Sequence, residues 1–206
     1  MTKYKSDNVH NRTMTLTGHG EMNMSPDMVI IHLGVETRGE DLSRIQAENA
    51  RISQSVIQAL QRMGITNIKT IRYSIDKVFD FVDGRQIDRG YLVRNILEIK
   101  TNNIEATGNI IDASVNAGAN IVELISFDVS NREYYYRQAL NMAIINAIQK
   151  AESIALNLGL SSAPQIVSIV ENTAIPFLPV QRELAATPII PGAINIAADV
   201  TVEFVF

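Results

Sequence analysis

Apolar and polar residues alternate along several stretches of the chain, which is the pattern of β-strands with one buried face. In residues 26–39 the apolar residues Val29, Ile31, Leu33 and Val35 fall on one face, and they predict a strand. The same pattern predicts further strands over residues 11–20, 68–81, 87–100, 121–129, 165–170 and 194–206. Much of the chain is therefore expected to be sheet with one covered side.

Three other stretches repeat apolar residues every three or four positions, which predicts amphipathic helices. They cover residues 41–63, about 102–117 and 130–158. The spacings Asn102-x-x-Glu105 and Ser130-x-x-Glu133 resemble capping boxes at the second and third helix starts. Between two of the strands, Asp83-Gly84 predicts a tight hairpin turn.

The order of these elements is β-β-α-β-β-α-β-α-β-β, which predicts the α+β class, with helices packed on a largely antiparallel sheet. Residues 28–129 follow the order β-α-β-β-α-β of a ferredoxin-like core. The absence of a linker predicts one domain over residues 13–206, with residues 1–12 as an N-terminal tail.

Composition excludes several kinds of chemistry. The 206 residues contain no Cys, which excludes disulfides, thiolate metal sites and Cys nucleophiles. A net charge of −4 argues against a nucleic-acid partner. We expect no transmembrane segment, since no run of about 18 apolar residues occurs. Two Lys near the N-terminus precede no apolar stretch, so a cytoplasmic location is expected, with the cell envelope as the alternative if a signal was removed.

The chain resembles the SIMPL-domain family in several stretches that occur in a fixed order. They are Thr15-Leu-Thr-Gly-His-Gly-Glu21, Pro26-Asp27, Leu33-Gly-Val-Glu-Thr37, Ala117-Gly-Ala-Asn120, Ile125-Ser-Phe127, Ala151 to Gly159, and Pro191-Gly192 before the last strand. The resemblance implies a bacterial α+β protein of the oxidative-stress-defence or periplasmic-immunogenic type, often exported to the cell envelope. It also implies self-assembly, and it brings no defined catalytic activity and no catalytic residues.

Candidate chemical groups are few. The histidines are His10, His19 and His32, and there is no Gly-x-Ser-x-Gly nucleophile motif. His19 and Glu21 form a weak candidate metal pair, since neighbouring side chains on one strand face supply two ligands at most. We expect no catalytic residue and no cofactor.

Three further clusters allow a chemical or a structural interpretation. Asp76, Asp80, Asp83 and Asp88 gather around the predicted hairpin, where acids could act as acid–base groups or could be solvated turn residues. Met22, Met24 and Met28 could bind Cu(I) or react with oxidants, and they could equally fill a core. Tyr134-Tyr-Tyr136 begins the third helix, where at most two of the three rings can be buried.

Contact surfaces are the better-supported features. The apolar, Pro-containing stretch Ile175-Pro176-Phe177-Leu178-Pro179-Val180 predicts an interface with another subunit or a cover for the sheet edge. An exposed edge of the last strand is a second candidate. The third is the helix face of Ala143, Ala147, Ala151 and Ala155, whose small side chains would let another backbone approach closely. The sequence therefore predicts a non-enzymatic homo-oligomer with a role in stress defence. A small-molecule or metal-binding module is the alternative, and a hydrolase based on the acidic cluster has the least support.

Overall fold

The computed structural model describes residues 12–172 and 192–206, and it is an α+β structure with two antiparallel sheets. The predicted fold class is therefore confirmed. In chain order the elements are β1 (Thr13–Met24), β2 (Met28–Gly39), α1 (Leu42–Arg62), β3 (Ile68–Val82), β4 (Arg85–Thr101), the short 3-10 helix η1 (Ile104–Ala106), α2 (Thr107–Asn116), β5 (Ile121–Asp128), α3 (Arg132–Asn157), β6 (Gln165–Asn172) and β7 (Ile194–Val205).

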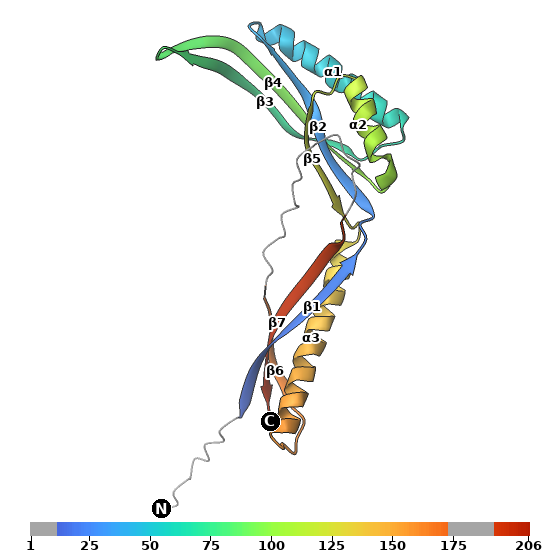
Figure 1. The fold of residues 1–206 in the computed structure, drawn as a ribbon, viewed down its shortest axis with the longest axis vertical. Coiled ribbons are helices and arrows are strands. Elements are labelled where there is room, and N and C mark those ends of the chain that lie inside the picture. The colour runs from blue at the N-terminus through green and yellow to red at the C-terminus, as the bar shows by residue number, and fades with distance from the viewer. Residues whose placement is uncertain (1–11, 173–191) are drawn as a thin grey trace, which may run out of the picture. The chain divides into compact units, whose positions relative to one another are not determined.

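Two compact units contain these elements (Figure 1). The four-stranded unit comprises residues 25–130, with the strand order β3-β4-β2-β5. The three-stranded unit combines residues 12–24, 131–172 and 193–206, with the order β1-β7-β6. The prediction of one domain over residues 13–206 stays a prediction, as does the ferredoxin-like description of the core.

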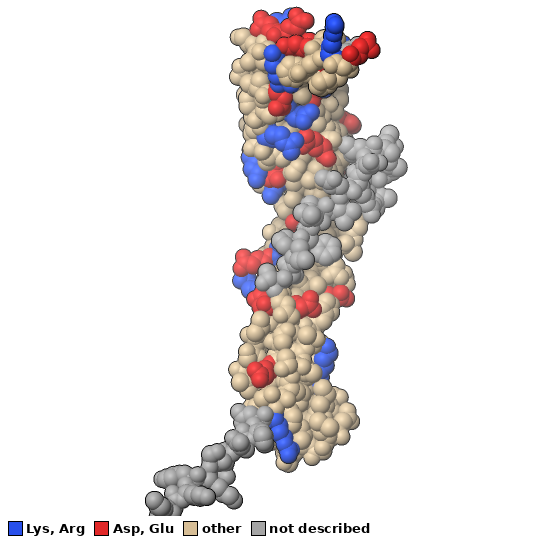
Figure 2. All heavy atoms as spheres, turned by 90° about the vertical axis from the view of Figure 1, so that its left-hand side faces the viewer, with Lys and Arg blue, Asp and Glu red and all other residues tan. Residues whose placement is uncertain are grey.

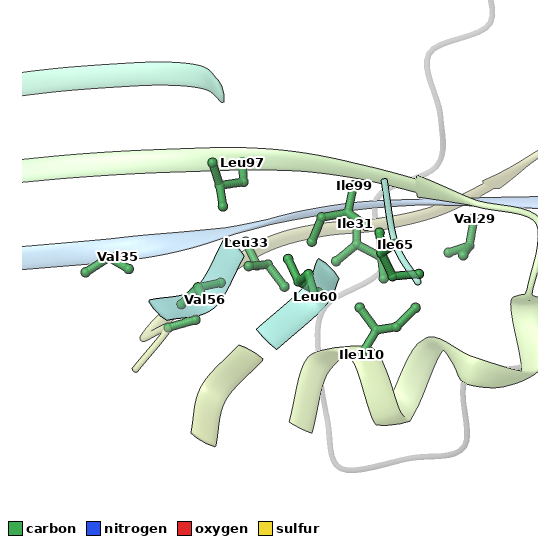
Figure 3. Close-up of a cluster of buried hydrophobic side chains, with 11 residues drawn as sticks. Val29, Ile31, Leu33, Val35, Val56, Leu60, Ile65, Leu97, Ile99 and Ile110 are labelled. Carbon is green, nitrogen blue, oxygen red and sulfur yellow. The ribbon is translucent and has the colours of Figure 1, made fainter. Parts of the chain in front are cut away.

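The core of the four-stranded unit lies between one face of its sheet and the helices α1 and α2 (Figure 3). Every second residue of β2 from Val29 to Val35 is almost fully buried, as the alternation predicted. Val56 and Leu60 come from α1, and Ile110 comes from α2. Each aliphatic side chain buried in this way contributes about 1.5–3 kcal/mol, so this layer accounts for much of the unit's stability.

A network of hydrogen-bonded polar side chains is buried in the same layer. Asn49 of α1 donates its amide hydrogens to the carbonyl oxygens of Val35 and Val93, at 2.9 and 3.1 Å. Ser53 donates to Asn49, and Asn95 of β4 donates to Ser53. Because buried polar groups are costly unless they are hydrogen-bonded, this hydrogen-bond network fixes one position of α1 on the sheet.

The turn follows local sequence rules, but both predicted helix caps need correction. Asp83 and Gly84 form the predicted hairpin turn, with φ of 50° and 75°. Asn102 is not the cap at the second helix start, because Asn103 caps η1 and its side chain accepts from the amide of Ala106. The prediction that Ser130 caps the third helix is wrong. The cap of α3 is Asn131, whose side chain accepts a hydrogen bond from the amide of Tyr134. Ser130 instead donates its amide hydrogen and its hydroxyl hydrogen to the carboxylate of Asp27.

The strand β3 is less covered than its alternating pattern predicted. In this pattern Ile71, Tyr73 and Ile75 are the apolar residues of one face, but each is exposed, by 38%, 49% and 40%. The physical reason is position in the sheet, since β3 pairs with β4 on one side only and lies at the end of the strand order. An edge strand keeps part of its apolar face in contact with water.

In the three-stranded unit the last strand, β7, lies between β1 and β6. The expectation that this strand offers an exposed edge is therefore wrong, because both of its edges are hydrogen-bonded to neighbours. Its alternation is confirmed, since Ile196, Val200, Val202 and Phe204 are buried. The pattern predicted which face is covered, but pairing partners are chosen by the whole fold.

The alanine row of α3 packs against this sheet. Ala139, Ala143, Ala147, Ala151 and Ala155 are buried. A Cβ on Gly18 would overlap the carbonyl oxygen of Ala143, and one on Gly20 would overlap that of Ala139. The expected close approach to another backbone is thus made within the chain, by β1. The alanine face is covered, and its assignment as a self-association surface is wrong.

Candidate functional site

The main cluster of titratable groups in the three-stranded unit is built by strand pairing. In the register of β1 and β7, His19 lies opposite Asp199. Directly opposed residues share one face of an antiparallel sheet, and here the two side chains meet, with Nδ1 of His19 2.8 Å from Oδ1 of Asp199. Both are about half exposed. The alternation of β1 explains their outward direction, because neighbouring Gly18 and Gly20 face α3.

Glu21 completes this cluster on the same strand face. Its Oε2 lies 3.8 Å from Nε2 of His19, so each ring nitrogen has a carboxylate neighbour. The hydrogen bond that Nδ1 of His19 donates to Asp199 raises the pKa of His19 above its ordinary value, and the charge of Glu21 adds to the effect. A doubly protonated imidazole has no lone pair for a metal ion. The arrangement therefore favours an ion-paired imidazolium.

A shallow hollow of about 400 Å³ adjoins this cluster. His19, Gly20 and Glu21 line it on the β1 side. From α3 it is lined by Met142, Ile145, Asn146 and Gln149. The hollow thus combines carboxylate, imidazole and amide groups with two apolar side chains, which are 46% and 52% exposed. Such a surface can hold a small polar molecule only loosely, because it encloses little of it.

The outer edge of β1 is closed by two side chains of α3. The amide of His19 donates to Oδ1 of Asn146 at 3.2 Å. Nζ of Lys150 donates to the carbonyl oxygen of Thr17 at 2.9 Å. A second strand cannot pair with these backbone groups without displacing both side chains. This is one way in which native proteins protect a strand edge.

The candidate metal pair from the sequence is thus brought together, but with a carboxylate that the sequence did not indicate. Asp199 is 180 positions from His19, and only the strand register places them together. Within residues 12–172 and 192–206 no group of three potential metal ligands has suitable geometry. His32 lies in the other unit, 3.1 Å from Oε2 of Glu98, and His10 is outside the described residues.

The acidic residues around the hairpin are arranged mainly as ion pairs. Lys77 lies 2.8 Å from Asp88, and Arg89 lies 2.7 Å from Asp80. Asp83 forms the turn itself. The hydrogen bond from Lys77 lowers the pKa of Asp88, which makes it a poorer proton acceptor. Nothing in this geometry supports the hydrolase hypothesis.

The methionines are divided between the two units, and the three tyrosines have different partners. Met22 and Met24 are on β1 in the three-stranded unit, whereas Met28 begins β2 in the four-stranded unit. Tyr136 donates its hydroxyl hydrogen to Glu171 of β6 at 2.6 Å. Tyr134 remains 45% exposed and contacts Tyr135 edge to face, with ring centroids 5.4 Å apart.

The candidate interface from Ile175 to Val180 lies outside the described residues. It stays a prediction.

A comparison of the sequence with models of protein families shows which family the chain belongs to. The model of the SIMPL family, described as proteins of unknown function (DUF541), matches residues 14–204. The chain belongs to the SIMPL family. This confirms the resemblance seen in the sequence, and it brings no established activity with it.

Curated relatives of this SIMPL chain come from bacteria. The 26 kDa periplasmic immunogenic proteins of Brucella melitensis and Brucella abortus are each 27% identical to it, over 94% of this chain and 83% of theirs. The uncharacterized protein YggE of Escherichia coli K12 is 22% identical, over 68% of this chain and 57% of its own length.

The expected cytoplasmic location is contradicted by these relatives. Two proteins that align with almost the whole SIMPL chain carry the word periplasmic in their names. The expectation rested on the N-terminal residues alone, which is a weak basis for a location. Separately, none of the helices in the described part of the chain combines the length and apolar character needed to cross a membrane.

Proposed function

We propose that this SIMPL chain is a non-enzymatic, self-associating protein of the bacterial periplasm with a role in stress defence. The observation that carries self-association is the exposure of apolar residues on two edge strands, β3 and β6. On β3 these residues are Ile71, Tyr73, Ile75, Phe79 and Phe81. On β6 they are Ile166, Val167, Ile169 and Val170. Exposed apolar edges pair readily with strands of another chain.

The contrast with β1 strengthens this argument. The outer edge of β1 is bonded by Asn146 and Lys150. Among the described residues, no side chain hydrogen-bonds to the backbone of β3 between residues 72 and 77. The β1 edge of the three-stranded sheet is thus protected by side chains, whereas the β3 edge of the four-stranded sheet is left available and suits a partner strand. The names of the Brucella relatives support the periplasmic location, and the family resemblance supports the role in stress defence.

Light scattering coupled to size-exclusion chromatography tests self-association. We expect a mass above that of the 22.8 kDa chain at micromolar concentration. Deletion of residues 175–180 should lower this mass if that segment is a contact. A monomer throughout the micromolar range would contradict the proposal. The stress role is tested by comparing survival of a deletion strain in oxidant with that of a complemented strain.

A small-molecule or metal-binding module remains the second candidate, on the observation of the hollow beside His19 and Glu21. Elemental analysis of the purified protein and a thermal-shift screen test it, with His19→Ala as the matched variant. A stabilising ligand whose effect disappears in the variant would favour this function. The absence of both bound metal and ligand-dependent stabilisation would contradict it.

A further inference from the structure

The strand β3 contains a short, regular stretch at the edge of its sheet. Its pairing with β4 shifts register between Thr70 and Arg72 and again between Lys77 and Phe79. Between these two irregularities, residues 72–77 pair with β4 one to one. A regular stretch of this length can form a ladder with one further strand on its outer side.

The side chains of this stretch point alternately to the two faces of the sheet. Ile75 is paired with Val93, which is buried, and Tyr73 is paired with Asn95, which hydrogen-bonds Ser53 of α1. Tyr73 and Ile75 therefore lie on the face that the helices cover. Arg72, Ser74 and Asp76 alternate with them and lie on the opposite face.

The opposite face carries charges of both signs. On it Arg94 of β4 pairs with Glu36 of β2 at 2.7 Å, and Lys69 pairs with Glu98 at 2.9 Å. Figure 2 shows basic and acidic side chains interspersed over this unit, with neither sign forming a large patch. A partner that adds to this sheet should therefore carry mixed charges as well.

We propose that β3 pairs in antiparallel orientation with β3 of a second copy, about a two-fold axis at Ser74. This inference rests on the proposed self-association and specifies its contact. An antiparallel strand is compatible with a two-fold axis, so each copy presents the same surface to the other. The two four-stranded sheets then join into one continuous sheet.

Charge complementarity selects this register. With the axis at Ser74, Arg72 of each copy lies opposite Asp76 of the other, which forms two ion pairs across the axis. Tyr73 then lies opposite Ile75, so the exposed apolar side chains cover each other on the helix face. Opposed pairs of these kinds stabilise the pairing of antiparallel strands.

Neighbouring registers lack these contacts. An axis at Tyr73 places Arg72 opposite Ser74 and brings Lys69 toward Lys77, which have the same charge. An axis at Ile75 places Arg72 opposite Val78 and Tyr73 opposite Lys77. Arg72 already donates through Nη1 to Glu123 at 3.0 Å, but a guanidinium has five donor hydrogens and can bind a second carboxylate.

The absence of Cys from the chain makes cross-linking a direct test. In the proposed register, Ser74→Cys places two thiols opposite each other at a separation that a disulfide can span. Thr70→Cys is the matched control on the same strand, since its two copies would be about 27 Å apart, eight residues along the ladder. Each variant is oxidised with diamide at micromolar concentration and analysed by non-reducing electrophoresis.

We expect Ser74→Cys to form the linked dimer at least about tenfold faster than Thr70→Cys, because only the first pair meets the distance limit of a disulfide. In the Ser74→Cys background, Asp76→Lys should slow cross-linking by placing a second cation opposite Arg72. The exchanged pair Arg72→Asp with Asp76→Arg should restore it. Both charge variants are checked for folding by circular dichroism.

Equal cross-linking of Ser74→Cys and Thr70→Cys would overturn the inference. Light scattering of the unmodified chain then separates two cases. If the chain assembles, self-association stands on another surface and only the β3 contact is wrong. If the chain is monomeric, the proposed function fails together with the contact.

Discussion

At the residue scale, His19 shows how strand register creates an electrostatic group. Its imidazole lies between Asp199, at 2.8 Å, and Glu21, at 3.8 Å. The hydrogen bond that it donates to Asp199 is the largest contribution to its raised pKa. The sequence pointed to His19 and Glu21, since they are neighbours on one strand. It could not point to Asp199, whose distance along the chain is bridged only by the pairing of β1 with β7.

The variant Asp199→Asn should therefore bring the pKa of His19 back toward its ordinary value, measured by NMR titration of the ring protons. Because the folded-state pKa of His19 is raised, the pair stabilises the protein most below the ordinary His pKa, at about pH 5–6. That contribution disappears as the pH rises through the folded-state pKa. The unfolding free energies of wild type and variant should differ most in this acidic range.

The control for this prediction is Glu203→Gln, a carboxylate of β7 that is not part of the cluster. It should leave the His19 titration unchanged. An unchanged His19 pKa in Asp199→Asn would show that the ion pair is too exposed to matter in solution.

At the element scale, the packing of α3 on β1 depends on matched small residues. Gly18 and Gly20 lie against the backbone of Ala143 and Ala139. The alanine spacing of four predicted a close backbone approach, and this is confirmed. Which backbone would approach was not predictable, because a row of small residues fits a strand, a helix or a second subunit equally well. Only the tertiary structure identified β1.

The variant Gly20→Ala should destabilise the protein by about 1–3 kcal/mol or more, since its Cβ would overlap backbone atoms that cannot move independently. Thermal and urea unfolding measure this. Gly108→Ala in α2 is the matched control, because nothing lies within 4 Å of its added Cβ. The free energy of unfolding of that variant should rise by about 0.5–1 kcal/mol, because Ala has a better helix propensity than Gly. Equal effects of the two substitutions would refute the packing argument.

At the scale of the whole molecule, the two units differ in how the chain builds them. The four-stranded unit uses residues 25–130 for its sheet and helices, whereas the three-stranded unit brings together segments from both ends and from the middle of the chain. Asp27 accepts two hydrogen bonds from Ser130, so the ends of residues 25–130 lie together. A continuous segment with adjacent ends has the properties of an independently folding unit.

A fragment of residues 25–130 should therefore fold alone, with a cooperative thermal transition in circular dichroism and dispersed amide signals in NMR. Its core is formed by residues of β2, β4, α1 and α2 together with Ile65 and Ala119, all of which the fragment contains. The shorter fragment 25–118 is the control, because it lacks β5 and leaves one edge of β2 unpaired. If the longer fragment is unfolded, the core of this unit is not sufficient by itself.

The sequence alone determined the element types, the covered faces of β2 and β7, the hairpin turn and the family. These features depend on local periodicity and turn chemistry, which a chain carries in its residue order. The strand order, the partner of the alanine row, the carboxylate opposite His19 and the exposed edge of β3 were decided by the tertiary structure. They depend on which distant segments pair, and many pairings satisfy the same local pattern.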